Sequence, residues 1–281
     1  MGNPLIGVRE RTQRWVGVTA VMTALALCGT VSWTARGQDA GKPVPVKAMA
    51  KDANPDWEVA TVKASDPGDT RGQHINLQGR RVVLLDTTVE QFLLLSYGVQ
   101  QSQLAGLPGW AKMVRWDVDG VSDVEGQPSW KQLQGMIQKI LTERFGLQMH
   151  HEQWEMAVFA LTVAKGGPKM IADTSDPNGW MDQQNGEANG RHVEDLKNAS
   201  MADLALILQF HVDRPLVDQT GLKGRYDFKL QWTVDDAQTA AADAPPGLFT
   251  AIQDQIGLKL ERVKAPADVV VIDKVERPGA N

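Results

Sequence analysis

The sequence predicts an α+β protein of two homologous halves, each with two helices packed on an antiparallel sheet. The first observation is a Gly-Leu-x-Gly motif that is followed, in both copies, by an aromatic-Asp-apolar triplet. The copies are Gly106–Gly109 with Trp116–Val118, and Gly221–Gly224 with Tyr226–Phe228. We interpret the glycines as positive-φ residues of a tight turn that leads into a strand. A phosphate-binding loop would instead need a helix N-terminus directly after the glycines.

The second observation is an ungapped alignment between the C-terminal parts of the halves. Phe145–Met149 aligns with Ile256–Leu260, and Val158–Leu161 aligns with Val269–Ile272 at the same offset of 111 residues. We interpret these parts as hairpins, formed in the first half by 147–153 and 156–164. Each half would expose a sheet edge unless the other covered it. We therefore expect one compact pseudo-twofold body or two closely packed lobes.

The first 37 residues differ in composition from the rest of the chain. Arginines at 9, 11 and 14 precede an apolar run over 15–33, and small residues follow at Ala35 and Gly37. This order is typical of a secretory signal peptide, with an uncleaved membrane anchor as the alternative. We therefore predict a signal peptide over 1–37 and an exported protein, periplasmic or extracellular. Residues 38–55 lack periodicity and predict a flexible linker.

Charge and cysteine content exclude several classes of partner. Cys28 is the single cysteine and lies in the predicted signal, so the mature chain cannot form a disulfide. Without residues 1–37 the chain keeps 25 basic and 33 acidic residues, a net charge of −8. An acidic exported domain is unsuited to nucleic acid or anionic lipid. We expect no nucleic-acid partner, and membrane contact only through an uncleaved signal segment.

The first half is predicted to cover residues 56–165. Alternating and β-branched patterns predict strands over 57–62, 79–85 and 114–121. A helix with its N-cap among 86–88 is expected to end at Gly98. A second helix is expected to begin at Ser129, to bury one apolar face and to end at Gly146.

A polar, glycine-rich segment over 166–190 predicts a connecting loop between the halves. The second half, over 191–278, repeats the order of the first, with Ser200 as a helix N-cap. Its expected strands are 190–196, 214–217 and 226–233, and a helix is expected over 248–256. Another polar insert over 235–246 precedes that helix.

Residues that could carry chemistry are few. Asp117 and Asp227 are paired acids for general acid–base catalysis, acceptors of hydrogen bonds from the adjacent turns, or residues that face water. His150-His151-Glu152 has metal-ligand residue types, but neighbours on a strand point to opposite faces, and an exposed polar face is the default. His192 and His211 are interpreted as isolated. We therefore predict no catalytic residue, no metal site and no cofactor.

Tryptophan is unusually frequent, and seven tryptophans follow residue 37. Trp110 follows a turn and Trp180 lies in the predicted connecting loop, where exposed indoles suit ligand recognition. Arg225 and Lys223 give the second Gly-Leu-x-Gly corner a positive charge that the first corner lacks. Trp110, Trp180 and Arg225 are therefore the predicted ligand contacts, in the cleft between the halves and its polar inserts.

Several longer motifs carry a resemblance to a known family. They are Trp57–Lys63, Gly98-Val99, Gly106–Trp110, Val163–Lys169, Val217–Phe228 and Lys264–Pro278. Over residues 57–278 the chain resembles a soil-associated, exported bacterial family of unknown function that occurs in many paralogous copies. Related domains follow membrane-bound zinc peptidase domains of the antibiotic-sensor type. The resemblance implies an exported domain without an established active site.

The leading hypothesis is a non-enzymatic envelope module that binds a protein, a peptide or a small ligand. One alternative is a hydrolase that acts on envelope or extracellular polymers, which would require His150, Glu152, Asp117 or Asp227 to converge in one pocket. The other alternative is a structural envelope protein that associates with itself through sheet edges.

Overall fold

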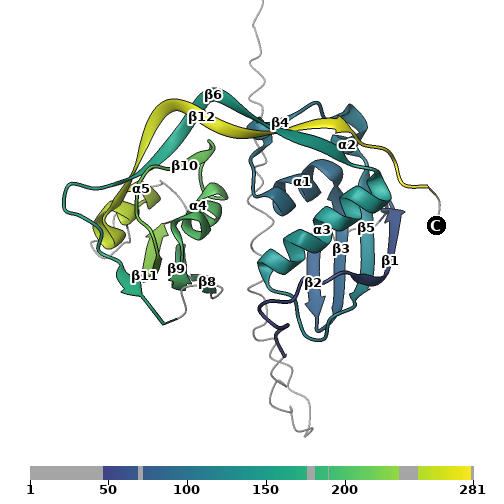
Figure 1. The fold of residues 1–281 in the computed structure, drawn as a ribbon, viewed down its shortest axis with the longest axis horizontal. Coiled ribbons are helices and arrows are strands. Elements are labelled where there is room, and N and C mark those ends of the chain that lie inside the picture. Colours follow the sequence, from purple (N-terminus) through teal and green to yellow (C-terminus); the bar gives the residue numbers. More distant parts are fainter. Residues whose placement is uncertain (1–46, 69–71, 176–180, 189, 234–245, 280–281) are drawn as a thin grey trace, which may run out of the picture.

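The computed structural model describes residues 47–68, 72–175, 181–188, 190–233 and 246–279, and it shows an α+β protein with two lobes (Figure 1). A long two-stranded ribbon crosses both lobes and joins them. The α+β class is therefore confirmed. The predicted signal peptide, residues 38–46 of the predicted linker, Trp180 and most of the second polar insert lie outside the described residues.

The first lobe is a four-stranded antiparallel sheet with helices on one face. Its strand order is β1-β5-β3-β2, formed by β1 (Trp57–Ala64), β5 (Arg115–Ser122), β3 (Arg81–Thr88) and β2 (His74–Gln78). The covering helices are α1 (Val89–Tyr97) and α3 (Trp130–Phe145), and the connection to β5 contains η3 (Gln101–Gln103), β4 (Leu104–Ala105) and α2 (Gly109–Met113). Inward-facing strand residues and the helices share one apolar core. The edge strand β2 was not predicted.

Local sequence signals set the ends of α1 and α3. The Thr88 side chain accepts a hydrogen bond from the Gln91 N–H, and Ser129 does the same for Gln132, so both helices begin with a capping box. Each helix ends at a glycine in the left-handed region, Gly98 and Gly146. The predicted starts and ends of both helices are confirmed.

The second lobe has a sheet of order β7-β11-β9-β8. Its strands are β7 (Ile171–Asp173), β8 (Asp182–Ala188), β9 (Arg191–Ala199) and β11 (Arg225–Thr233). Its helices are α4 (Met201–Gln209), with the predicted N-cap Ser200, and α5 (Leu248–Ala251), which continues as the π-helical turn η4 (Ile252–Ile256). The prediction of a loop throughout 166–190 is wrong, because β7 and β8 lie there. Both are sheet-edge strands: β7 has only three residues and β8 is polar, so neither shows an apolar alternation.

The ribbon replaces the two predicted hairpins. β6 (Gln148–Val163) is one continuous strand that pairs antiparallel with β12 (Leu258–Lys274) along its length. The short strands β10 (Leu216–Asp218) and β4 pair with the ribbon's edges. A period-two pattern indicates that a segment is extended, but it does not show which strand pairs with it. The prediction of hairpins was wrong for this reason.

The ends of the ribbon complete the cores of opposite lobes. Val270 and Ile272, near the end of β12, belong to the core of the first lobe. Leu161, near the end of β6, belongs to the core of the second lobe, together with Leu258 at the start of β12. Each lobe therefore contains a strand segment contributed from the other half of the sequence.

The lobes also contact each other where α1 and α4 end. The Gln209 side-chain amide donates to the Gly98 carbonyl, and the Gln100 amide donates to the carbonyls of Gln209 and Val212, both at 3.0 Å. A Cβ atom on Gly98 would lie 2.5 Å from a methyl carbon of Leu206, so glycine permits this close approach. The two lobes are therefore packed against each other as well as joined by the ribbon.

The segment before β1 is attached to the first lobe. Met49 is 5% exposed, its N–H donates to the Gln127 carbonyl at 2.9 Å, and the Gln132 side chain donates to Ala50 at 2.8 Å. The packed body therefore begins before residue 56, within the segment that composition predicts to be a linker. Over the described ranges, no helix has both the length and the apolar content needed to cross a membrane.

The two Gly-Leu-x-Gly turns lead into different elements. Gly106, Gly221 and Gly224 have the predicted positive φ, of 75°, 66° and 105°. Gly109 does not, because it begins α2, and the expectation that a strand directly follows both copies is wrong for the first. At Gly106 a Cβ would lie 2.5 Å from the Ile272 carbonyl oxygen, so this glycine lets the turn approach the ribbon.

Candidate functional site

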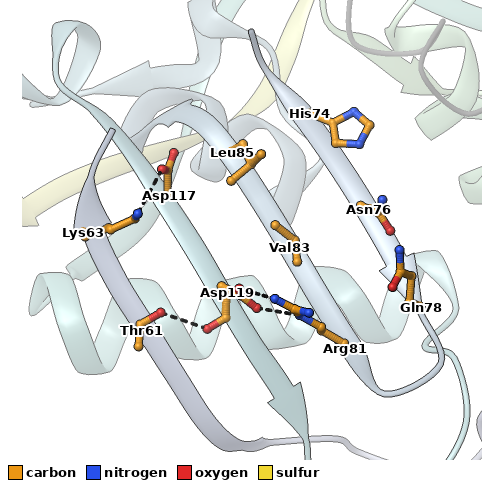
Figure 2. Close-up of a pocket in the computed structure, with 10 residues that line it drawn as sticks. All are labelled: Thr61, Lys63, His74, Asn76, Gln78, Arg81, Val83, Leu85, Asp117 and Asp119. Carbon is orange, nitrogen blue, oxygen red and sulfur yellow. Dashed lines mark hydrogen bonds and ion pairs between the residues drawn. The ribbon is translucent and has the colours of Figure 1, made fainter. Parts of the chain in front are cut away.

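The outer face of the first sheet carries a polar depression of about 430 Å³ (Figure 2). The helices cover the other face, so strand alternation directs every second side chain into this surface. All four strands contribute to its lining, which consists of Thr61, Lys63, His74, Asn76, Gln78, Arg81, Val83, Leu85, Asp117 and Asp119. The surface carries positive and negative side chains beside an aliphatic strip formed by Val83 and Leu85.

Arg81 and Asp119 form a two-pronged ion pair across neighbouring strands. The guanidinium donates to both carboxylate oxygens, at 3.0 and 2.6 Å, and Thr61 donates to the Asp119 backbone carbonyl at 3.2 Å. The hydrogen bond from Arg81 lowers the pKa of Asp119 despite partial burial. Since both side chains are substantially exposed, the pair orients charge on the surface and adds little stability.

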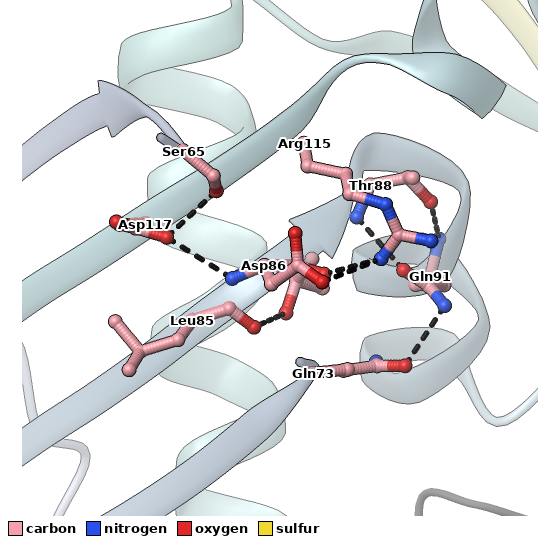
Figure 3. A network of polar contacts seen from close by, with 9 residues as sticks. Ser65, Gln73, Leu85, Asp86, Thr88, Gln91, Arg115 and Asp117 are labelled. Carbon is pink, nitrogen blue, oxygen red and sulfur yellow. Dashed lines mark hydrogen bonds and ion pairs between the residues drawn. The ribbon is translucent and has the colours of Figure 1, made fainter. Parts of the chain in front are cut away.

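Asp117 is a buried acceptor beneath the same face (Figure 3). Its Oδ1 accepts hydrogen bonds from the Ser65 hydroxyl at 2.7 Å and the Asp86 N–H at 3.0 Å, and the ammonium of Lys63 lies 4.0 Å from its Oδ2. Asp86 has a φ of 52°, a conformation that aspartate tolerates better than most residues, at an irregularity in the β3–β5 pairing. Arg115 donates to its backbone and side-chain oxygens.

The second lobe repeats this arrangement. Asp227 accepts from the Asn198 N–H at 2.9 Å, and Asn198 has a φ of 53°. Asp117 and Asp227 lie on separate sheets and do not form a catalytic pair. The interpretation as acceptors is confirmed, although the donors lie in the strand bend before a helix and not in the glycine turns.

The edge strand β2 presents three polar side chains in a row. His74, Asn76 and Gln78 alternate along it, and within the described residues none of their side chains has a hydrogen-bond or ionic partner. Behind them, the Thr88 N–H donates to Gln91, and Gln91 donates to Gln73 at 2.9 Å, which ties the start of β2 to α1 (Figure 3). The row is therefore held in place while its own polar groups stay available.

Two of the three predicted ligand contacts, Trp110 and Arg225, lie away from the depression. Trp110, in α2, is half-buried against the first core, and the guanidinium carbon of Arg277 lies 5.5 Å from its ring centre. Arg225, in β11, donates to the Asn198 carbonyl at 2.7 Å and to Asp203 at 3.3 Å. Trp180 lies outside the described residues. The structure does not bring Trp110 and Arg225 into the depression, and their role in recognition stays a prediction.

The His150-His151-Glu152 cluster is exposed on the ribbon. As predicted, His150 shares a face with Glu152, at 3.0 Å, while His151 contacts Asp268 instead. His150 also contacts Asp273 at 3.0 Å; this hydrogen bond, followed by that with Glu152, raises the pKa of His150. Of the four residues required by the hydrolase hypothesis, only Asp117 lines the depression. The structure does not assemble that set there.

The interpretation of His192 and His211 as isolated is wrong. Their ring centres are 4.7 Å apart, and Trp232 packs against both. His192 also contacts Glu194 at 2.8 Å. Sequence reasoning missed this cluster, although the two-residue spacing of His192 and Glu194 on a strand was a usable signal. His211 lies beyond α4 and carries no local signal of its proximity.

The two histidines respond oppositely to their surroundings. Burial lowers the pKa of His211 to about 4, with a further contribution from the neighbouring His192. Burial also acts to lower the pKa of His192, but hydrogen bonds and charges from Glu194 and Glu187 outweigh it and raise the pKa. His211 is therefore a neutral imidazole at physiological pH.

The chain matches a known protein family. A family model described as a protein of unknown function (DUF3738) matches residues 90–275, which include parts of both lobes and the whole ribbon. Comparisons with curated proteins and with solved structures gave no match.

Proposed function

The chain belongs to the DUF3738 family of proteins of unknown function, and we propose that it is an exported, non-enzymatic module that binds a small ligand. The ligand class that fits is a short peptide or amino-acid-like molecule with both a carboxylate and an ammonium group. The observation that carries the proposal is the depression on the first sheet, where charged side chains of both signs from β1, β3 and β5 lie beside the polar row on β2.

Each part of such a ligand has a matching group on this face. Lys63 and His74 suit a ligand carboxylate, and ionised Asp119, whose pKa is lowered, suits an ammonium group. Asn76 and Gln78 offer amide donors and acceptors for a peptide backbone. The aliphatic strip of Val83 and Leu85 provides apolar contact between them.

A binding role agrees better with the site than hydrolysis does. Asp117 already accepts hydrogen bonds from Ser65 and Asp86, so its carboxylate supports the backbone of the sheet. A general base needs an accessible oxygen within reach of a substrate proton. Binding by the row on β2 requires no such group.

We also propose that the protein is exported and consists of two homologous halves. The basic, apolar and small-residue order of 1–37 supports an exported protein, and the motif resemblance supports a soil-associated family. The proposal of two homologous halves is supported by the matched left-handed residues Asp86 and Asn198, each two residues before a helix N-cap.

The test is calorimetric titration of the purified protein with short peptides and amino acids, with neutral sugars as a comparison. Replacing both Asn76 and Gln78 by alanine should weaken peptide binding at least about tenfold, since two hydrogen bonds are lost. The matched control replaces Gln184 and Asn185, which are exposed on the edge strand β8 of the other sheet. Equal binding by both double variants, or no binding by any of these peptides, would contradict the proposal.

A further inference from the structure

A second cluster of chemistry-bearing residues lies inside the second lobe, away from the proposed ligand site. His192 and Glu194 project from β9, and His211 follows the end of α4. One donor atom from each of the three side chains lies within 4.8 Å of the other two. It is the one such group of three found among the described residues. Trp232 of β11 packs against both histidines. Two imidazoles and one carboxylate therefore meet where β9, β11 and the segment after α4 come together.

The cluster is enclosed and contains an unused donor site. His192 is 5% exposed and Glu194 is 1% exposed. The Nε2 atom of His211 is buried and has no hydrogen-bond partner within the described part of the chain. Buried polar atoms are nearly always paired, so an unpaired ring nitrogen beside a histidine and a glutamate requires an explanation.

The donor set matches a divalent transition metal. Imidazole nitrogen and carboxylate oxygen are ligands of Zn²⁺ and its first-row neighbours, at about 2.0–2.2 Å from the ion, which places tetrahedral donors roughly 3.3 Å apart. The His192 Nε2 and the Glu194 Oε1 are 2.8 Å apart, a hydrogen-bond distance. An increase of about half an ångström in the distance between these two atoms would let an ion take the place of the shared proton.

The surroundings hold the ligands in the manner of an outer coordination shell. The Gln183 amide donates to the second oxygen of Glu194 at 2.9 Å, and the Glu187 carboxylate lies 3.4 Å from the Nδ1 of His192. A carboxylate on the far nitrogen of a ligating histidine fixes its tautomer and increases its basicity. Trp232 packs 4.3 Å from His192 and 4.9 Å from His211, measured between ring centres.

We propose that His192, Glu194 and His211 form a binding site for a divalent first-row transition-metal ion such as Zn²⁺. His192 and Glu194 are nearly fully buried and His211 is partly buried, so a substrate has little access to the ion and we assign it a structural role. Three protein ligands leave the fourth position of a tetrahedral ion to water. The ion would join β9 to the segment after α4 and thereby stabilise the second lobe. The exposed His150 cluster on the ribbon differs, because both nitrogens of His150 already contact carboxylates.

The experiment uses purified protein without a histidine tag, stripped of metal with a chelator. Calorimetric titration with Zn²⁺ should show one tight site per chain, and Co²⁺ should give visible absorption bands of a four- or five-coordinate ion. Replacing His211 or Glu194 by glutamine should weaken Zn²⁺ binding by more than about 100-fold, beyond the 10–100-fold typical of outer-shell changes. The control, His150→Gln with Glu152→Gln, should leave the affinity unchanged.

A measurement on the wild-type protein tests the metal site even if the variants fail to fold. Zinc-edge X-ray absorption of the wild-type complex reports the ligands directly, and the site predicts two imidazoles with additional oxygen ligands. Retained tight binding in folded H211Q and E194Q variants, loss of binding in the control, or absorption data without imidazole would each overturn the proposal. The same holds if the stripped protein binds no Zn²⁺, in which case the cluster is an ion pair of His192 with its two glutamates.

Discussion

Glu155 lies opposite Pro266 at the midpoint of the β6–β12 ladder. These residues are 111 positions apart, the offset at which Phe145–Met149 aligns with Ile256–Leu260. If each residue of β6 is exchanged for the residue 111 positions later on β12, and the reverse, the pairing of the ribbon stays the same. Leu258 lies opposite Val163 at one end of the ladder, and Ile272 lies opposite Met149 near the other. A consequence is that each half extends a strand into the lobe built by the other half.

The first prediction concerns the exchanged strand ends. Ile272 and Leu258 lie on the same strand, but Ile272 belongs to the first core and Leu258 to the second. Each substitution by alanine should cost about 2–5 kcal/mol of stability, as expected for buried aliphatic residues. Hydrogen exchange should show that I272A loses protection in β1, β3 and α3, and that L258A loses it in β9 and β11. The reverse pattern would contradict the exchange of strand ends.

The second prediction separates the two glycines of the first motif. Gly106→Ala should destabilise the protein by about 1–3 kcal/mol or more, because alanine is strained at a φ of 75° and its Cβ would lie 2.5 Å from the Ile272 oxygen. Gly109→Ala is the matched control, since a Cβ there meets no atom within 4 Å. Urea denaturation measures both. Similar midpoints for the two variants would refute the role assigned to Gly106.

The third prediction compares two acids on β5. Asp117→Ala leaves the Asp86 N–H and the Ser65 hydroxyl without their acceptor and should cost about 1–3 kcal/mol. Asp119→Ala removes only an exposed ion pair with Arg81 and should cost about 1 kcal/mol or less. Chemical denaturation of both variants provides the comparison. An equal or larger loss for D119A would show that Asp117 is not the structural acceptor.

Local signals predicted the parts of the fold that depend on neighbouring residues. Thr88, Ser129 and Ser200 act on N–H groups three residues away, and Gly98 and Gly146 end their helices through their own φ, so all five could be identified in the sequence. The ribbon could not, because the pairing of β6 with β12 joins residues about a hundred positions apart and leaves no local pattern.

The same distinction holds for the two sites. His150 and Glu152 were correctly placed on one face because strand alternation is local. The depression depends on β2, whose short polar-alternating sequence at a sheet edge carries a weak signal. The proposed metal site depends on His211, which the fold brings to His192 from beyond a helix. Trp110 was predicted to contact a ligand from its residue type, without knowledge of its packing partner Arg277.

The fourth prediction concerns the titration of His150. Its pKa should lie above the ordinary value of 6.5, because the carboxylate of Asp273, and after it that of Glu152, favours the protonated ring. Since the folded pKa is raised, the stabilisation is complete below pH 6.5 and is lost as the pH rises through the folded value. The effect on stability is small for an exposed ring, so nuclear magnetic resonance titration is the measurement.

Two carboxylate variants make this titration specific. Asp273→Asn should lower the pKa of His150 towards its ordinary value. Asp268→Asn, which removes the partner of His151 on the opposite face of the ribbon, should leave the His150 titration unchanged. A His150 pKa that is insensitive to D273N would show that the contact is absent in solution.

The central claim, that the outer face of the first sheet binds a short charged peptide, is tested most directly by mapping amide chemical shifts during a peptide titration. Saturable changes are expected to concentrate in His74–Gln78 and Arg81–Leu85, with the second lobe unaffected. Changes centred on Trp110 or Arg225, or no saturable change with any peptide that carries both charges, would contradict it.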